Sequence, residues 1–496
     1  MRASLVHLSA LTFTLALLSG CVSGGNISSS GGTGSGSTPT AVTVTFPGPT
    51  PTAVATQIGN GAYTAATLTS GQLSLQIPAG TTNFAVAFVC PSETDYTGGT
   101  GIITILYNTD AMSSNHIART SRLLSHPIAG AGTHKAQDIV DGFYTTTAEE
   151  VFAASTLDGT SFTASCSSPA GNTASNLGSA TGEFDISALG EFVQLDTVGI
   201  NESSGASWYT QDLTGVSGVS TKGFSAGFPV GSDRVILVVS AVGSNGGTLT
   251  AIKSLDNQTA PGALNNGQPI VFNTSDIVTY QPITYKNLPA GCTTPSTQAS
   301  FVPSGTQTQI GVGGINGRYP AAPASALENG DYYFIQSNTG PCNTAAFVRI
   351  TTSSGGPVTI NFPAPWSYAG PSAAALPTFP NLDYSGFAGT GTQAVELGWF
   401  WSSPSGDISA YSFIATRNSM SGASSLTFPD FSSVPGFLAP PPSGQEVGWE
   451  AALVQSTYGI QPAPAGLAIE AGNAVWPVTA NGTVSSVGSA GSYVVP

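Results

Sequence analysis

The chain has 496 residues, only 7% of them charged, and its 26 acidic side chains outnumber its 11 lysines and arginines for a net charge of −15. Ordinary soluble proteins have about 25% charged residues. Nucleic acid binding needs clustered cations to neutralise phosphates, and electrostatic adsorption to anionic lipid needs them too. The composition therefore excludes nucleic acid as a partner and leaves a covalent anchor as the route to a membrane.

The first 20 residues have the pattern of a secretion signal. Met1 and Arg2 provide a positive start, and residues 5–18 form an apolar run. As a helix this run is only about 21 Å long, which is too short for a bilayer core of about 30 Å. We therefore expect residues 1–20 to be removed on export.

The apolar run ends in Leu18-Ser19-Gly20-Cys21, an aliphatic residue followed by two small residues and a cysteine. This sequence resembles the lipobox of bacterial lipoproteins, and the resemblance covers residues 1–21 only. It implies that the Cys21 thiol receives diacylglycerol, that the signal is cut before Cys21, and that the new amine is acylated. The alternative is an ordinary secretory signal with a chance cysteine.

The resemblance also implies a location. Several acyl chains, at about 0.8 kcal/mol per buried CH₂, would hold the mature protein at a membrane. Val22 occupies the position where an aspartate retains many lipoproteins in the inner membrane, so its presence favours the outer membrane or cell surface. Lipidation at Cys21 is thus the expected link to a membrane partner.

The composition of the body predicts an all-β fold. Residues 21–41 form a Gly/Ser/Thr tether, and short β-type runs punctuated by Gly, Pro and Asn follow. We expect tandem β-sandwich domains of immunoglobulin-like type. The expected boundaries give a β domain with a short helix at 42–180, a β-sandwich at 181–285, a β domain at 286–380 and a Trp-rich β-sandwich at 381–496.

Two local patterns predict particular elements. Six Asn-Gly pairs fit type I′ turns, and the pair at Asn245 lies between two β-type runs, residues 235–239 and 248–252, which predicts a hairpin. The sequence Thr147-Ala148-Glu149-Glu150 matches a capping box, which predicts a short helix there.

Four cysteines remain besides Cys21. An even number in an exported chain predicts two disulfides. Three pairings are open, and we favour the local one, Cys90 with Cys166 and Cys292 with Cys342, because each bridge then stays within one expected domain. Thiolate metal binding is the alternative, although the chain has no C-x-x-C spacing.

The only cluster of imidazoles is at residues 116–134. His116, His126 and His134 lie there, and His134, Asp138 and Asp141 have helical spacing. These residues are candidates for a metal or acid-base site, but the spacing is not that of a known zinc motif and a solvated loop is the favoured interpretation. We expect no metal and no cofactor.

The C-terminal third has most of the tryptophans. Trp399 and Trp401 share one face of an extended strand and Trp449 follows, so these three are candidates for a sugar-stacking platform. Sandwich core is the favoured interpretation. Glu396, Glu446 and Glu450 are candidates for paired catalytic carboxylates, although acids at strand edges are the favoured interpretation.

Three functional hypotheses follow. The favoured one is a lipid-anchored cell-envelope protein with a structural or interaction role, and not an enzyme. The second is a surface lipoprotein that binds carbohydrate, and the third is an envelope hydrolase, although no G-x-S-x-G, P-loop or dinucleotide motif is present. The expected partners are the membrane, through Cys21, and envelope proteins or polysaccharide.

Overall fold

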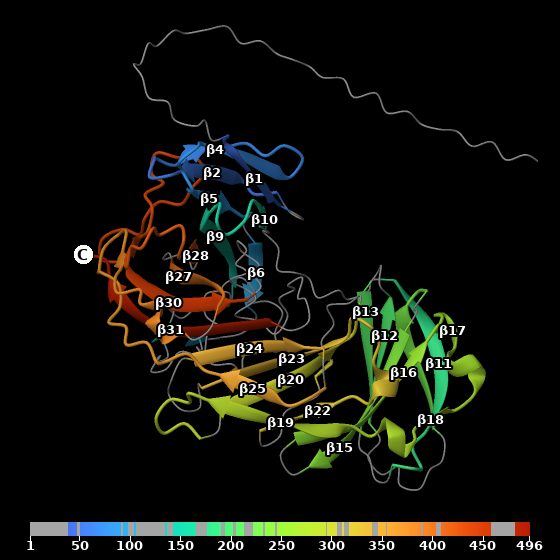
Figure 1. Cartoon of the computed structure of the whole chain (residues 1–496). Coiled ribbons are helices and arrows are strands. Elements are labelled where there is room, and N and C mark those ends of the chain that lie inside the picture. Colours follow the sequence, from blue (N-terminus) through green and yellow to red (C-terminus); the bar gives the residue numbers. More distant parts are fainter. Residues whose placement is uncertain are drawn as a thin grey trace, which may run out of the picture. The chain divides into compact units, whose positions relative to one another are not determined.

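The structure is a computed structural model of the whole chain (Figure 1). It describes residues 38–46, 50–90, 93–97, 104–105, 134–135, 142–164, 176–189, 194–201, 205–212, 222–231, 234–243, 246–293, 295–304, 310–311, 317–339, 346–353, 355–387, 390–402, 408–457 and 482–496. Within these ranges no helix is long and apolar enough to cross a membrane. The expected signal and tether lie outside them, except for residues 38–41.

The described part of the chain is built from strands, which confirms the all-β prediction. Its largest sheet contains 13 strands. In spatial order they are β21 (Ile310–Gly311), β20 (Ser296–Val302), β23 (Tyr332–Asn338), β24 (Ala346–Thr352), β31 (Gly482–Val494), β30 (Glu446–Ser456), β27 (Thr392–Ser402), β28 (Ile408–Thr416), β9 (Gly142–Ser155), β5 (Asn83–Val89), β2 (Ala53–Ile58) and β3 (Thr64–Ala65), with β6 (Glu93–Thr97) also paired to β9. Strands from three of the four expected segments are therefore hydrogen-bonded in one sheet.

Smaller sheets complete the described fold. They are β10 (Ser161–Thr163), β1 (Thr40–Thr45) and β4 (Gln72–Ile77); β14 (Lys222–Pro229), β11 (Leu177–Asp185), β17 (Gly262–Ala263) and β18 (Ile270–Val271); β13 (Gly205–Asp212), β12 (Gln194–Asn201), β15 (Arg234–Gly243) and β16 (Gly246–Asp256); β22 (Arg318–Ala321), β19 (Thr279–Lys286) and β25 (Val358–Asn361); β26 (Thr378–Phe379) with β29 (Leu426–Thr427); and β7 (Thr104–Ile105) with β8 (His134–Lys135). Short 3₁₀ turns lie at Leu264–Gly267, Thr274–Asp276, Ala324–Ala326 and Tyr384–Gly386.

Burial patterns explain which strands are central. In β4 every second residue is buried, so Leu73, Leu75 and Ile77 face the large sheet while the residues between them face solvent. Strand β5 is buried on both faces, and its sequence is accordingly a continuous apolar run. The small sheet containing β4 covers one face of the large sheet. Segments that include β26 and β29 cover the other face, where a second core lies.

A second sheet-on-sheet packing lies between residues 177 and 272. One face of the β13-β12-β15-β16 sheet packs on β11 and β14, and the other packs on the core around β19, β20 and β23. Gly199 in β12 permits close approach, because a Cβ there would lie 2.5 Å from the Phe228 ring. Face-to-face sheets are the packing expected of β-sandwiches.

The predicted hairpin is confirmed, and the predicted helix is wrong. Strands β15 and β16 pair antiparallel from Arg234↔Asp256 to Gly243↔Gly246. Residues 147–150 belong to strand β9, which pairs with β5 on one side and β28 on the other. Val151 and Phe152 enter opposite cores, which an extended chain allows. Pairing on both edges and burial on both faces therefore override the local capping signal.

Cys90 and Cys292 are buried and disulfide-bonded. Their expected partners, Cys166 and Cys342, lie outside the described residues. The pairing therefore stays a prediction.

A buried ion pair joins β15 to the segment before β23. Arg234 is 5% exposed and Asp331 is 4% exposed. The Arg234 Nη1 and Nη2 atoms donate to the two Asp331 carboxylate oxygens at 2.8 and 2.9 Å. The backbone N–H groups of Ser304 and Glu328 also donate to Asp331, each at 2.7 Å. The guanidinium also donates to the Ala326 carbonyl and the Ser254 hydroxyl, and its Nε lies 3.2 Å from the partly exposed Glu328 carboxylate.

Asp331→Ala should destabilise the chain by about 3–5 kcal/mol, because it removes the buried carboxylate from Arg234 and leaves the partly exposed Glu328 as its ion-pair partner. The double variant Arg234→Met/Asp331→Ala should lose less than the sum of the two single variants, since it removes the charge as well. Urea unfolding of the purified chain measures both. Lys253→Met is the control, because Lys253 is more exposed in its pair with Asp276. An Asp331→Ala loss no larger than that of Lys253→Met would contradict the role of the buried pair.

Candidate functional site

The three tryptophans proposed as a sugar platform are core residues. Trp399, Trp401 and Trp449 are 0, 9 and 7% exposed. The Trp399 and Trp401 rings lie 5.1 Å apart, and the Trp399 indole nitrogen donates to the Tyr493 hydroxyl at 2.9 Å. The platform interpretation is therefore wrong and the core interpretation is confirmed, because segments outside the sheet pack over this face.

Glu396 and Glu446 do not form a catalytic pair, and a pair that includes Glu450 stays untested. Glu396 is buried in β27 and pairs across the sheet with Ala452, six residues along β30 from Glu446. Six residues of strand put the α-carbons of Glu396 and Glu446 about 20 Å apart, whereas glycosidases hold their two carboxyl groups about 5–9.5 Å apart. The Glu450 side chain lies outside the described residues.

The histidine cluster is mostly outside the described part of the chain. His116, His126, Asp138 and Asp141 all lie there. His134 is in strand β8, where it pairs with Ile105, so the backbone at this end of the proposed helical motif is extended. A metal site at these residues stays an untested alternative.

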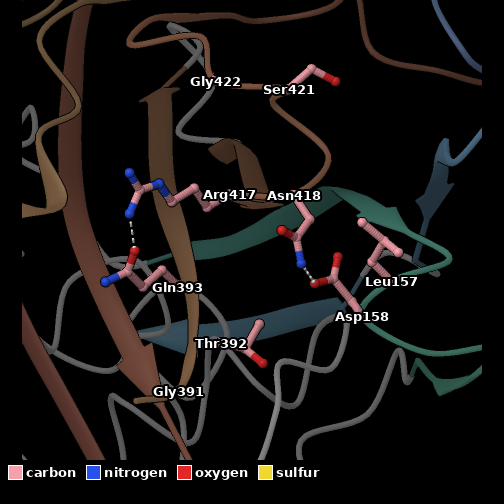
Figure 2. A pocket seen from close by; sticks show the side chains of 9 residues that line it. All are labelled: Leu157, Asp158, Gly391, Thr392, Gln393, Arg417, Asn418, Ser421 and Gly422. Carbon is pink, nitrogen blue, oxygen red and sulfur yellow. Dashed lines mark hydrogen bonds between the residues drawn. The ribbon is translucent and has the colours of Figure 1, made fainter. Parts of the chain in front are cut away.

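The structure instead contains a recess that sequence analysis did not predict. It has a volume of about 550 Å³ and is open to solvent. We call it the polar recess, and define it by the residues that line it, 157–158, 391–393, 417–418 and 421–422. Figure 2 shows these side chains, which come from three separate parts of the chain.

Strand pairing brings these parts together. Strands β9 and β28 are parallel, so both end at the same edge of the large sheet. Strand β27 is antiparallel to β28 and begins at that edge. The residues that follow β9 and β28 therefore meet the first residues of β27.

Asp158 is held in place at this edge by three hydrogen bonds. One of its carboxylate oxygens accepts from the Ser155 backbone at 2.9 Å and from the Thr416 hydroxyl at 2.5 Å. The other accepts from the Asn418 amide at 2.6 Å, as Figure 2 shows. The bonds from Thr416 and Asn418 join residues 258 and 260 positions apart in the sequence, and the three bonds together fix the direction of the carboxylate.

Arg417 provides the positive charge of the recess. Its guanidinium lies over the Tyr384 ring, 5.4 Å from the ring centre, and its Nη1 donates to the Gln393 side-chain oxygen. Hydrogen bonds from Ser385, and then the Arg417 charge, hold the pKa of the exposed Asp383 carboxyl below its usual range. Burial raises the pKa of Tyr384, so the ring beneath the guanidinium is a neutral phenol.

The polar recess is therefore a site of paired donors and acceptors. Its lining has one carboxylate, one guanidinium and several amide and hydroxyl groups, and neither histidine nor cysteine. Such a set can bind a polar molecule, because it offers both donors and acceptors. Two features of the sequence could have indicated it. Asp158-Gly159 is a turn pair, and Arg417 is one of only 11 basic residues.

No family model and no curated protein matches the chain. Among solved structures, it is similar to the C-terminally truncated tip fimbrial protein Mfa3 from Porphyromonas gingivalis. The identity is 11%, the match covers 36% of this chain and 83% of that one, and the TM-score is 0.16. A TM-score this low says nothing about what this chain does.

Asp158→Ala should destabilise the chain by about 1–3 kcal/mol, because three donors at the sheet edge lose their acceptor. Asp430→Ala is the matched control, since in the described part of the chain Asp430 bonds within its own turn, to Ser432, and its replacement should cost about 1 kcal/mol or less. Thermal unfolding of both variants tests the comparison. Equal losses would show that Asp158 does not link β9 to β28.

Proposed function

We propose that the chain is an exported, lipid-anchored cell-envelope protein whose β-rich body has a structural or binding role. The observation that carries this proposal is the sequence Leu18-Ser19-Gly20-Cys21 at the end of a short apolar run. An uncharged tether follows it and would space the body from the membrane. The membrane is thus the first partner, and envelope proteins or polysaccharide are the others.

The described body supports a non-catalytic role. Two ion pairs that each include a buried carboxylate, Arg234 with Asp331 and Lys253 with Asp276, have a structural role. The tryptophans proposed as a ligand platform fill the core instead. Ion pairs of this kind make the β-rich body rigid. Rigidity suits a scaffold or a binding protein.

Carbohydrate binding is the second candidate function. The observation that favours it is the polar recess, where donors and acceptors are held side by side. The candidate sugar site is therefore the sheet edge at which β9 and β28 end, in place of the buried tryptophans.

Cys21→Ser should move the protein from the membrane fraction to the soluble or secreted fraction, because a hydroxyl does not replace the thiolate that takes the lipid. Ser19→Ala is the matched control, since it keeps a small residue before the cysteine and should stay in the membrane fraction. Fractionation followed by immunoblotting measures both. A Cys21→Ser protein that partitions like the wild type would overturn the proposed anchor.

An exported location also permits disulfides. Peptide mapping without reductant should recover Cys90 linked to Cys166 and Cys292 linked to Cys342. Each bridge would contribute roughly 4 kcal/mol through the loop that it closes. A peptide that joins Cys90 to Cys292 or Cys342 would show that the local pairing is wrong.

A further inference from the structure

The groups that line the polar recess restrict the class of molecule that can bind there. Arg417 and the amide groups of Gln393 and Asn418 supply donors, while the Asp158 carboxylate supplies an acceptor. A phosphate or carboxylate ligand only accepts, and it would be repelled by Asp158 within a chain of net charge −15. A cationic ligand would be repelled by Arg417. A hydroxyl group both donates and accepts, so a neutral polyhydroxylated ligand matches both kinds of lining group.

The lining is preorganised for such a ligand. Asp158 is fixed by its three hydrogen bonds, and Arg417 is fixed by the Gln393 side chain and the Tyr384 ring. Groups that are already ordered lose little entropy on binding. Both charged groups thus keep their positions in the absence of a ligand.

The recess also has an apolar side. Leu157 is 74% exposed, the largest value among the exposed large hydrophobic side chains of the described residues, and it lies beside Asp158 in the turn after β9. A single exposed leucine is ordinary on a protein surface. At this position, however, it places an apolar surface next to a carboxylate. Sugars present C–H faces beside hydroxyl edges, and they match that combination.

We propose that the polar recess binds a neutral saccharide unit, with hydroxyl groups on Asp158 and Arg417 and a C–H face on Leu157. The volume of about 550 Å³ lies within the range of small-molecule sites. This inference rests on the proposed role as an envelope protein, which would face polysaccharide. The open, solvent-exposed site implies weak binding to each unit, with a Kd in the millimolar range.

The test uses the full-length chain in micelles of a detergent without a sugar headgroup. D-glucose, D-galactose, D-mannose and N-acetylglucosamine are titrated separately and binding is followed by saturation-transfer NMR, with D-glucuronate as the charged comparison. At least one neutral sugar should bind more tightly than glucuronate. Leu157→Ser and Arg417→Met should each weaken that binding by about tenfold or more.

Two matched controls lie outside the recess. Leu177→Ser replaces another exposed leucine and Arg318→Met another exposed arginine, and both variants should bind like the wild type. Melting temperatures of all four variants identify any loss that comes from unfolding. Because Leu157 is mostly exposed, its replacement should leave the melting temperature unchanged.

Three results would overturn the proposal: no binding of any neutral sugar, binding that survives both Leu157→Ser and Arg417→Met, or a preference for glucuronate. The last would assign the recess to anions instead. The binding assay does not depend on where the protein resides in the cell, and fractionation of Cys21→Ser does not depend on sugar binding. Failure of either proposal is therefore distinguishable from failure of the other.

Discussion

The parallel pairing of β9 with β28 is the contact on which the centre of the structure depends. It aligns residues 146–153 with residues 408–415 and so joins the N-terminal and C-terminal parts of the large sheet. The neighbouring pairs, β5 with β9 and β27 with β28, are antiparallel. Parallel strands end at the same edge, so this pairing also creates the edge at which the polar recess lies.

Burial on both faces stabilises that pairing. Phe152 in β9 and Ile414 in β28 enter the core beneath the small sheet of β1, β4 and β10. Val151 and Phe413 enter the opposite core with Trp399. Because adjacent residues of a strand alternate between faces, a continuous apolar sequence can fill both cores. The aromatic side chains of the C-terminal third therefore pack in the cores, and the polar groups of the recess lie at the ends of the strands.

The few charged residues of the chain are used in two different ways. Arg234 and Asp331 are buried together and satisfy one another with help from backbone groups. Asp158 and Arg417 lie instead at a solvent-facing edge, where each has a defined partner and still faces the recess. The first arrangement is a buried ion pair that stabilises packing, whereas in the second each charged group bonds to a neighbouring amide side chain and lines an open recess.

The sequence by itself was sufficient for the features that depend on neighbouring residues. Strand-forming composition predicted the all-β class, and alternation around Asn245 predicted the β15–β16 hairpin. The expected export signal and lipidation at Cys21 likewise depend on a contiguous motif. The capping box at residues 147–150 led to a wrong helix prediction. A capping box is a local preference of about 1 kcal/mol, and the pairing of β9 on both edges outweighs it. The recess and the Arg234–Asp331 pair were decided only by the tertiary structure, since their partners lie 97 to 260 residues apart. A local sequence pattern does not indicate which distant strands will pair, and strand pairing determines which side chains lie close together.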